Sequence, residues 1–300
     1  MKVKVGTRES KLAVAQSKII IEQIWGKYSN IEFELIPIKT SGDAMLDQRL
    51  EKIGGKGLFV KEIEYALLNK KIDIAIHSMK DMPAEMASGL KIAAVSVRED
   101  PRDVLVCKRG LRFNDLPEGS VIGTSSLRRE MQLKNLRTGI RFKLLRGNVN
   151  SRIEKMNKGE YDAIVVAAAG LKRLGMENLA AEYFEVCDII PAVGQGILGV
   201  QTREDFDSDF ITDAVHCNEA ELQLKAERAY MVKLGGGCSI PIGAHAVIIG
   251  DDMLLYGMYA DTGKNILYKD CIRGQKEDAQ KLGQFLAEKI LKQVETQANK

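Results

Sequence analysis

An aspartate in a polar loop is the side chain that could most directly do chemistry. Asp81 follows Ser78 and Lys80 in a loop that ends at Pro83. The preceding segment, Ile72–Ile76, is a short β-branched run between polar flanks, which predicts a buried parallel strand. Ligands of open α/β sheets bind at the carboxyl ends of such strands, where a carboxylate can stabilise positive charge or move protons. A simple turn aspartate before the Met-Pro pair explains the pattern equally well.

Hydroxyls and arginines at the start of a predicted helix form a candidate anion site. The strand that ends at Gly123 is followed by Thr124, Ser125, Ser126, Arg128 and Arg129. The helix dipole, the free N–H groups and the guanidinium forks all favour a carboxylate or phosphate there. Arginine in a first turn is unfavourable for the helix itself, so we place a bound ligand slightly ahead of an ordinary N-cap with solvated arginines.

Other predicted strands also end in cationic loops. Arg8 and Ser10 repeat the same logic more weakly, and Arg146 and Arg152 flank a further loop. Any one of these arginines would be surface charge by default. Because four such loops all end strands, the sequence predicts a cleft for a ligand with several carboxylates.

Cys238 stands apart from the other four cysteines. It follows three glycines and precedes a Ser-Ile-Pro sequence. Most cysteines are inert and buried, and that interpretation suits the other four. The glycines let the Cys238 loop approach another surface and expose the thiol, which predicts a nucleophile or a covalent attachment point. No His-Cys pairing is visible from spacing, so a protease-like dyad is unsupported.

Two glycine motifs do not support nucleotide binding. The glycines at 194, 196 and 199 satisfy the dinucleotide pattern, but they run on towards Val200 and Arg203 without opening a helix. We therefore reject NAD and assign these glycines to a hinge or to close packing. Gly55, Lys56 and Gly57 lack the spacing of a Walker A sequence.

The composition limits the remaining function classes. A chain of 300 residues predicts two or three domains, and a net charge of +3 argues against a polyanion binder held by bulk charge. Five cysteines without a C-x-x-C pair fit a reducing cytosol, and three scattered histidines leave little material for a metal site. We expect no signal peptide and no membrane span, and therefore a cytoplasmic protein.

The elements predicted to position these residues form two similar α/β lobes and a smaller α+β domain with a three-stranded antiparallel sheet. We expect domain 1 at residues 1–98 and 197–216, domain 2 at 99–196 and domain 3 at 217–300. Residues 40–56 are polar without a clear period, as in many mobile active-site loops.

Two short echoes support the similarity of the lobes. Gly6-Thr7 before Ser10 and Gly123-Thr124 before Ser126 each end a strand and open a helix. Asp73 and Asp162 each begin a buried strand. The match is too short to prove duplication.

Together these residues resemble the porphobilinogen deaminase family, also called hydroxymethylbilane synthases, over nearly the whole chain. Each motif alone is weak, but together they are highly specific. Lys11 stands where the family commonly has proline. The segments that carry the resemblance are residues 7–13, 54–59, 77–83, 99–103, 123–129, 145–149, 169–175, 191–196 and 236–243.

The resemblance implies two periplasmic-binding-protein-like lobes with a small third domain. It implies head-to-tail condensation of four porphobilinogens, with loss of ammonia, to hydroxymethylbilane by a monomer. It further implies a dipyrromethane cofactor joined by a thioether to Cys238, with Asp81 as the catalytic residue. The cofactor would also be held by Ser78, Lys80, Thr124, Ser125, Ser126, Arg128, Arg129, Arg146 and Arg152. The substrate would be held by Arg8, Ser10, Lys56, Phe59, Arg173 and Gln195.

Two non-catalytic alternatives remain open from the sequence. A two-lobed binder of a small anion shares the cleft, but it gives no reason for Cys238 on a glycine loop or for Asp81 among cations. A nucleic-acid binder is disfavoured by the small net charge and by the lack of aromatic residues near the basic loops. An intact mass separates these alternatives, because only the enzyme requires two linked pyrroles on the chain.

Overall fold

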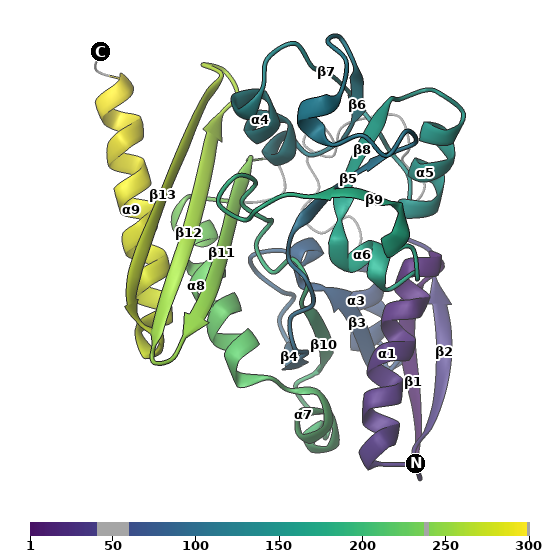
Figure 1. Cartoon of the computed structure of the whole chain (residues 1–300). Coiled ribbons are helices and arrows are strands. Elements are labelled where there is room, and N and C mark those ends of the chain that lie inside the picture. Colours follow the sequence, from purple (N-terminus) through teal and green to yellow (C-terminus); the bar gives the residue numbers. More distant parts are fainter. Residues whose placement is uncertain (41–59, 237–239, 299–300) are drawn as a thin grey trace. The chain divides into compact units, whose positions relative to one another are not determined.

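A computed structural model describes residues 1–40, 60–236 and 240–298 of the chain (Figure 1). Its described residues form two compact units. Unit 1 contains residues 1–40, 60–99 and 196–221, and unit 2 contains residues 100–195 and 222–298 apart from the undescribed 237–239. Each unit is considered by itself. The division into three domains is finer than these two units and stays a prediction.

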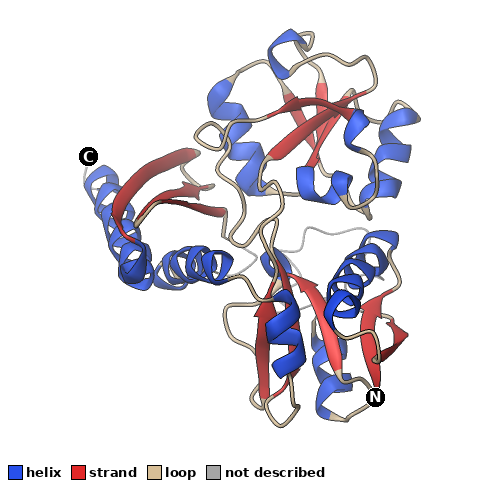
Figure 2. Cartoon of the chain, turned by 60° about the horizontal axis from the view of Figure 1, so that its bottom comes forward, coloured by secondary structure: helices blue, strands red, loops and turns tan. Residues whose placement is uncertain are grey.

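Unit 1 is built on one mixed sheet, whose strands are red in Figure 2. Its strand order is β2-β1-β3-β10-β4. Strand β1 runs parallel to β2 and β3, and β10 runs antiparallel to β3 and β4. The elements are β1 (Lys2–Arg8), α1 (Lys11–Lys27), β2 (Glu32–Ile38), α3 (Lys61–Leu68), β3 (Ile74–Ser78), the 3-10 helix η2 (Met79–Asp81), β4 (Leu90–Val95), β10 (Leu198–Arg203) and α7 (Asp209–Val215).

The first sheet of unit 2 has the order β7-β6-β8-β5-β9. Here β6 runs parallel to β7 and β8, and β5 runs antiparallel to β8 and β9. The elements are β5 (Asp103–Cys107), η3 (Phe113–Asp115), β6 (Val121–Gly123), α4 (Leu127–Leu136), β7 (Arg141–Lys143), α5 (Val149–Asn157), β8 (Ala163–Ala167), α6 (Ala168–Lys172), η4 (Glu177–Leu179) and β9 (Ala180–Tyr183).

The two sheets have the same plan. The strands β1, β2, β3, β10 and β4 correspond in position and direction to β6, β7, β8, β5 and β9. Gly6 lies opposite Ala75, and Gly123 lies opposite Ile164. Both echoes in the sequence therefore fall at equivalent places.

The paired aspartates make the same contact in each sheet. A carboxylate oxygen of Asp73 accepts the Lys4 N–H at 2.8 Å, and one of Asp162 accepts the Val121 N–H at 2.8 Å. Each aspartate also donates its own N–H to the carbonyl of the same partner, at 2.8 and 2.9 Å. In both sheets, a carboxylate therefore holds a backbone N–H group of the neighbouring strand.

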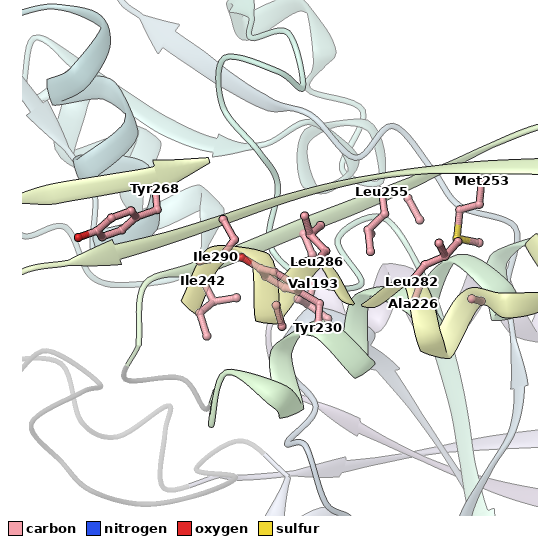
Figure 3. Close-up of a cluster of buried hydrophobic side chains, with 14 residues drawn as sticks. Val193, Ala226, Tyr230, Ile242, Met253, Leu255, Tyr268, Leu282, Leu286 and Ile290 are labelled. Atoms are coloured by element: carbon pink, nitrogen blue, oxygen red, sulfur yellow. The ribbon is translucent and has the colours of Figure 1, made fainter. Parts of the chain in front are cut away.

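A third sheet lies in unit 2 and is antiparallel, as predicted. It consists of β11 (Ile242–Ile249), β12 (Asp252–Asp261) and β13 (Ile266–Gln275), with α8 (Asn218–Lys233), η5 (Lys276–Asp278) and α9 (Ala279–Ala298). Its core gathers Tyr230, Leu255, Leu282 and Leu286 (Figure 3). Gly257 leaves room for the Tyr230 ring, which a Cβ there would meet at 2.8 Å.

The predicted fold class is confirmed: two α/β sheets and one small antiparallel sheet. The strand predicted at 72–76 begins two residues later and extends through Ser78. The sequence analysis missed β9 and α7. Among the residues described, the helices are all too short or too polar to traverse a bilayer.

Candidate active site

The turn that carries Asp81 is anchored on strand β10. Met79 is 3% exposed, and its N–H donates to the Ile197 carbonyl at 3.0 Å. Its sulfur occupies the space beside Gly199, where a Cβ would collide with it. Ser78 and Lys80 are half-buried, whereas Asp81 is exposed. Buried Met79 therefore anchors the turn, while Asp81 remains exposed.

Arg8 and Ser10 lie at the same edge of this sheet. Arg8 is the last residue of β1, and Ser10 is the N-cap of α1, with its hydroxyl accepting the Ala13 N–H at 3.2 Å. Because β1 and β3 are parallel neighbours, their carboxyl ends meet at one edge. Unit 1 thus brings its described candidate residues together at one edge of the sheet: Arg8, Ser10, Ser78, Lys80 and Asp81.

A buried polar chain lies behind the Asp81 turn. His77 Nε2 is 3.0 Å from Gln201 Oε1, and Gln201 Nε2 donates to Glu64 Oε1 at 3.0 Å. Burial lowers the pKa of His77 to about 4, against smaller opposing effects of Gln201 and Asp81. The sequence analysis placed His77 only within a motif and missed Gln201 and Glu64. The sequence did carry a sign of both: Gln201 is a polar residue inside an apolar strand, and Glu64 is a glutamate on the buried face of α3.

In unit 2, Ser126 is the N-cap of α4, as predicted. Its hydroxyl accepts the Arg129 N–H at 3.4 Å, and the hydroxyl of buried Thr124 accepts the Ser126 N–H at 3.1 Å. Ser125 is half-buried between them. The helix start is therefore capped by hydroxyls of its own chain, and the anion site predicted there stays a prediction.

The two arginines of this helix are not solvated, so that alternative was wrong. Arg128 and Arg129 are 5% and 6% exposed, and each donates to an oxygen of Asp103 at 2.7 Å. Gln195 Nε2 also donates to Asp103, at 2.9 Å. Burial acts to raise the pKa of Asp103, but the two guanidinium charges outweigh it and hold that pKa well below its usual value. From the sequence, Asp103 was only part of the 99–103 motif and was not named as a site residue; it opens an otherwise apolar strand.

This cluster carries more positive than negative charge. One carboxylate, Asp103, faces two guanidinium groups, and Nε of Arg129 is buried without a hydrogen-bond partner in the described part of the chain. A buried charge is stable only when it is paired, so the excess favours an anion at the start of α4. These residues fit a cofactor that carries carboxylates.

Further arginines lie at the same edge of the unit 2 sheet, because β6, β7 and β8 are parallel. Arg146 is buried after β7. Arg152 lies in α5 and donates from Nε to the Gly147 carbonyl at 2.8 Å, and Arg173 follows α6. This edge therefore gathers the described unit 2 candidates, including those around Asp103, which lies opposite the last residue of β8.

Three predicted residues, Lys56, Phe59 and Cys238, lie outside the described residues, as does the 40–56 loop beyond Thr40. The glycine motif runs into β10, which confirms the rejection of a dinucleotide fingerprint. Gly196 has a φ of 94°, and a Cβ on it would strike the Glu99 carbonyl. Close packing is thus the role of Gly196 and Gly199.

Two family models match the chain. The model for the porphobilinogen deaminase dipyromethane cofactor binding domain matches residues 3–211, and that for the porphobilinogen deaminase C-terminal domain matches residues 222–292. A porphobilinogen deaminase of Lysinibacillus sphaericus is 46% identical over 97% of this chain and 94% of its own length. One of Clostridium botulinum is 47% identical over 96% of this chain and 98% of its own.

Solved structures give a more distant likeness. The methionine-binding protein MetQ aligns with 74% of this chain and 90% of its own, at 13% identity and a TM-score of 0.45. An arginine-specific periplasmic binding protein of Salmonella typhimurium aligns with 71% and 91%, at 15% identity and a TM-score of 0.39.

The family assignment rests on the full-length relatives, and it supports the enzyme over the two-lobed anion binder. The chain belongs to the porphobilinogen deaminase family: it is a transferase that joins four porphobilinogens head to tail with release of ammonia, and it carries a dipyrromethane cofactor.

Proposed function

We propose that Asp81 is the catalytic carboxylate of this transferase. Loss of ammonia from porphobilinogen leaves an electron-poor azafulvenium, whose positive charge spreads over a pyrrole. An ionised carboxylate near the pyrrole N–H group stabilises that charge and can take up or return the protons. The observation that carries the proposal is the anchored turn after β3, which holds Asp81 exposed at the carboxyl edge of the sheet.

The cofactor is proposed to be attached to Cys238 through a thioether. When bound, the dipyrromethane supplies the terminal pyrrole carbon to which the first porphobilinogen is joined. The excess positive charge around Asp103 supports a role for the helix start in binding its carboxylates. The residues proposed to hold it are Ser78, Lys80, Asp81, Thr124, Ser125, Ser126, Arg128, Arg129, Arg146 and Arg152.

The incoming substrate is proposed to contact a second set of cations and polar groups. Each porphobilinogen brings two carboxylates, so a growing chain needs many anchors although the protein is nearly neutral overall. Gln195, one of these polar groups, also donates to Asp103 at 2.9 Å. The proposed substrate residues are Arg8, Ser10, Lys56, Phe59, Arg173 and Gln195.

Substitution of Asp81 tests the catalytic assignment. We expect Asp81→Asn to lower kcat by about 10²–10⁴-fold, because the amide cannot carry the negative charge. Asp115→Asn is a matched control, since Asp115 is also the exposed last residue of a 3-10 helix. Steady-state kinetics of both purified holoenzymes give the comparison. Near-native turnover of Asp81→Asn would refute the assignment.

Intact-mass spectrometry tests the attachment site. The wild-type chain should carry the added mass of two linked pyrroles, and Cys238→Ser should show the bare mass. Cys187→Ser is the control, because Cys187 is exposed and should leave the adduct in place. An adduct retained in Cys238→Ser would place the thioether elsewhere.

We further propose that the enzyme is a cytoplasmic monomer that binds neither nucleic acid nor membranes. The net charge of +3 supports this for nucleic acid, because bulk charge provides most non-specific binding to polyanions. Light scattering coupled to size exclusion, with and without DNA or anionic vesicles, tests the oligomeric state and both kinds of binding, and cell fractionation tests the location. A dimer mass or a co-eluting complex would contradict the proposal.

A further inference from the structure

The hydrogen bonds of Gln201 determine which ring nitrogen of His77 carries the proton. Gln201 Nε2 faces the Glu64 carboxylate at 3.0 Å, and an ionised carboxylate can only accept. Gln201 therefore presents its oxygen to His77, 3.0 Å from Nε2. That bond requires a hydrogen on Nε2. A neutral His77 then has Nδ1 unprotonated.

The other sheet shows that this polar chain is unnecessary for the fold. His77 lies opposite Gly199 in one sheet, as Val166 lies opposite Val104 in the other. Gln201 lies opposite Ala75, and its equivalent is again a valine, Val106. Ala75 and Ile164 are equivalent because each lies opposite the glycine that ends or precedes the end of the neighbouring strand, and Val106 lies opposite Ile164 as Gln201 lies opposite Ala75.

The equivalent valines pack in an apolar cluster with Ile153 of α5. Burying a histidine, an amide and a carboxylate costs free energy that two valines do not cost. The polar chain is therefore retained for a reason other than building the sheet.

Its position suggests that reason. Charged groups of three elements act on this chain. Glu64 of α3 accepts a hydrogen bond from Gln201, while Asp81 of η2 raises the pKa of His77 and Arg8, at the end of β1, lowers it. A protonated ring would be a buried cation at the base of the Asp81 turn. It would attract the carboxylate that has to stabilise the cationic substrate.

We propose that Glu64 and Gln201 are positioning residues that fix the orientation of the buried His77 ring, with its proton on Nε2, beneath the Asp81 turn. Together with Met79 on Gly199, the chain fixes the end of β3 against β10 and leaves the negative charge of Asp81 to the substrate. The inference rests on the proposed role of Asp81.

Removing the amide tests the positioning role. In Gln201→Met we expect kcat to fall about tenfold, since small displacements of a catalytic group are costly, with KM changed less than about twofold. The cofactor adduct should remain complete by intact mass. Thr202→Val is the matched control: Thr202 is the next residue on β10, and its buried hydroxyl has no hydrogen-bond partner among the described residues. A Gln201→Met kcat within about twofold of wild type would overturn the proposal.

A charge change tests the protonation state. In Gln201→Glu combined with Glu64→Gln, the carboxylate beside Nε2 has an amide as its neighbour and favours the imidazolium, so His77 should protonate at a higher pH than in wild type. The pH profile of kcat should then gain an acidic limb that tracks this ionisation. The chain has only three histidines, so ¹⁵N-edited NMR can follow the ring directly. A pH profile that superimposes on wild type, or a wild-type ring protonated on Nδ1, would overturn the proposal.

A double variant separates folding from function. His77→Val with Gln201→Val copies the other sheet, so it should keep a cooperative unfolding transition and a full cofactor adduct while losing most of kcat. Full activity in this variant would also refute the inference. If the wild type is active but the Gln201 variants match it, only this inference fails. If Asp81→Asn keeps near-native activity, the proposed catalytic role of Asp81 is refuted, and this inference is refuted with it.

Discussion

The two five-stranded sheets share one backbone plan but hold different chemistry at equivalent positions. In unit 1 the interior beneath the site contains the Glu64–Gln201–His77 chain, and in unit 2 it contains Asp103 with two arginines. The strand register makes Leu198 the counterpart of Asp103, since these residues lie opposite Ser78 and Ala167. Strand order and register thus do not depend on the polar groups.

This difference shows that two sheets with the same plan can carry different tasks in one protein. The unit 2 cluster buries net positive charge, which suits the holding of carboxylates. The unit 1 chain is centred on a histidine whose pKa is lowered by burial, and it lies under an exposed carboxylate that can face a developing cation. The variants below break each interior cluster in turn.

Neutralising Asp103 should have the largest effect on stability. Asp103→Asn leaves Arg128 and Arg129 buried without their counter-charge, and breaking such a group costs about 3–5 kcal/mol of unfolding free energy. Urea unfolding at pH 7 measures the change. A loss below about 1 kcal/mol would mean that the arginines are not held by this ion pair.

An apolar replacement of the whole cluster sharpens this comparison. Asp103→Leu takes the residue found at the equivalent position in unit 1. Combined with Arg128→Met and Arg129→Met, it should recover most of the stability lost in Asp103→Asn, because no buried charge remains. The same triple variant should fail to retain the cofactor if the arginines hold it, which intact mass would detect.

Removing His77 should change how stability depends on pH. The pKa of His77 is lowered to about 4 in the folded chain, from 6.5. Between these values the unfolded chain binds a proton that the folded chain resists, so the stability falls as the pH drops from 6.5 to 4. The full contribution is about 3 kcal/mol, and it is present above pH 6.5.

His77→Val should therefore flatten the dependence of the unfolding free energy on pH in that interval. Urea titrations at pH 4.5 and 7 of the variant and the wild type measure the difference. His216→Asn is the control, because His216 is more exposed at the surface of unit 1. Equal slopes for wild type and His77→Val would show that the ring does not resist protonation.

Most of the frame was predictable from the sequence because it depends on local patterns. Apolar runs marked the strands, and a hydroxyl marked the N-cap at Ser126. The short echoes at Gly6 and Gly123 located equivalent strand ends, although they could not prove the shared plan. The strand orders of the two sheets show the shared plan that these short sequence matches could not establish.

The interior clusters were not predictable, because they join residues far apart in the chain. Gln201 is 137 residues from Glu64 and 124 from His77. Nothing in the local sequence tells whether Arg128 faces solvent or a buried carboxylate 25 residues away. Spacing indicates which residues share an edge of a sheet, whereas these pairings depend on how β10 and β5 are inserted between their neighbours.

The smallest predicted effect distinguishes the two equivalent glycines. A Cβ at Gly123 would lie 2.7 Å from the Tyr161 ring and 2.9 Å from a methyl of buried Leu145. The ring is held by the bond from Tyr161 Oη to the Leu144 carbonyl at 2.8 Å. A Cβ at Gly6 would collide with the terminal methyl of Ile72, which can rotate away. Gly123→Ala should therefore cost about 1–3 kcal/mol, as in other overpacked cores, and Gly6→Ala less. Equal losses in urea unfolding would mean that the two strand ends are packed alike.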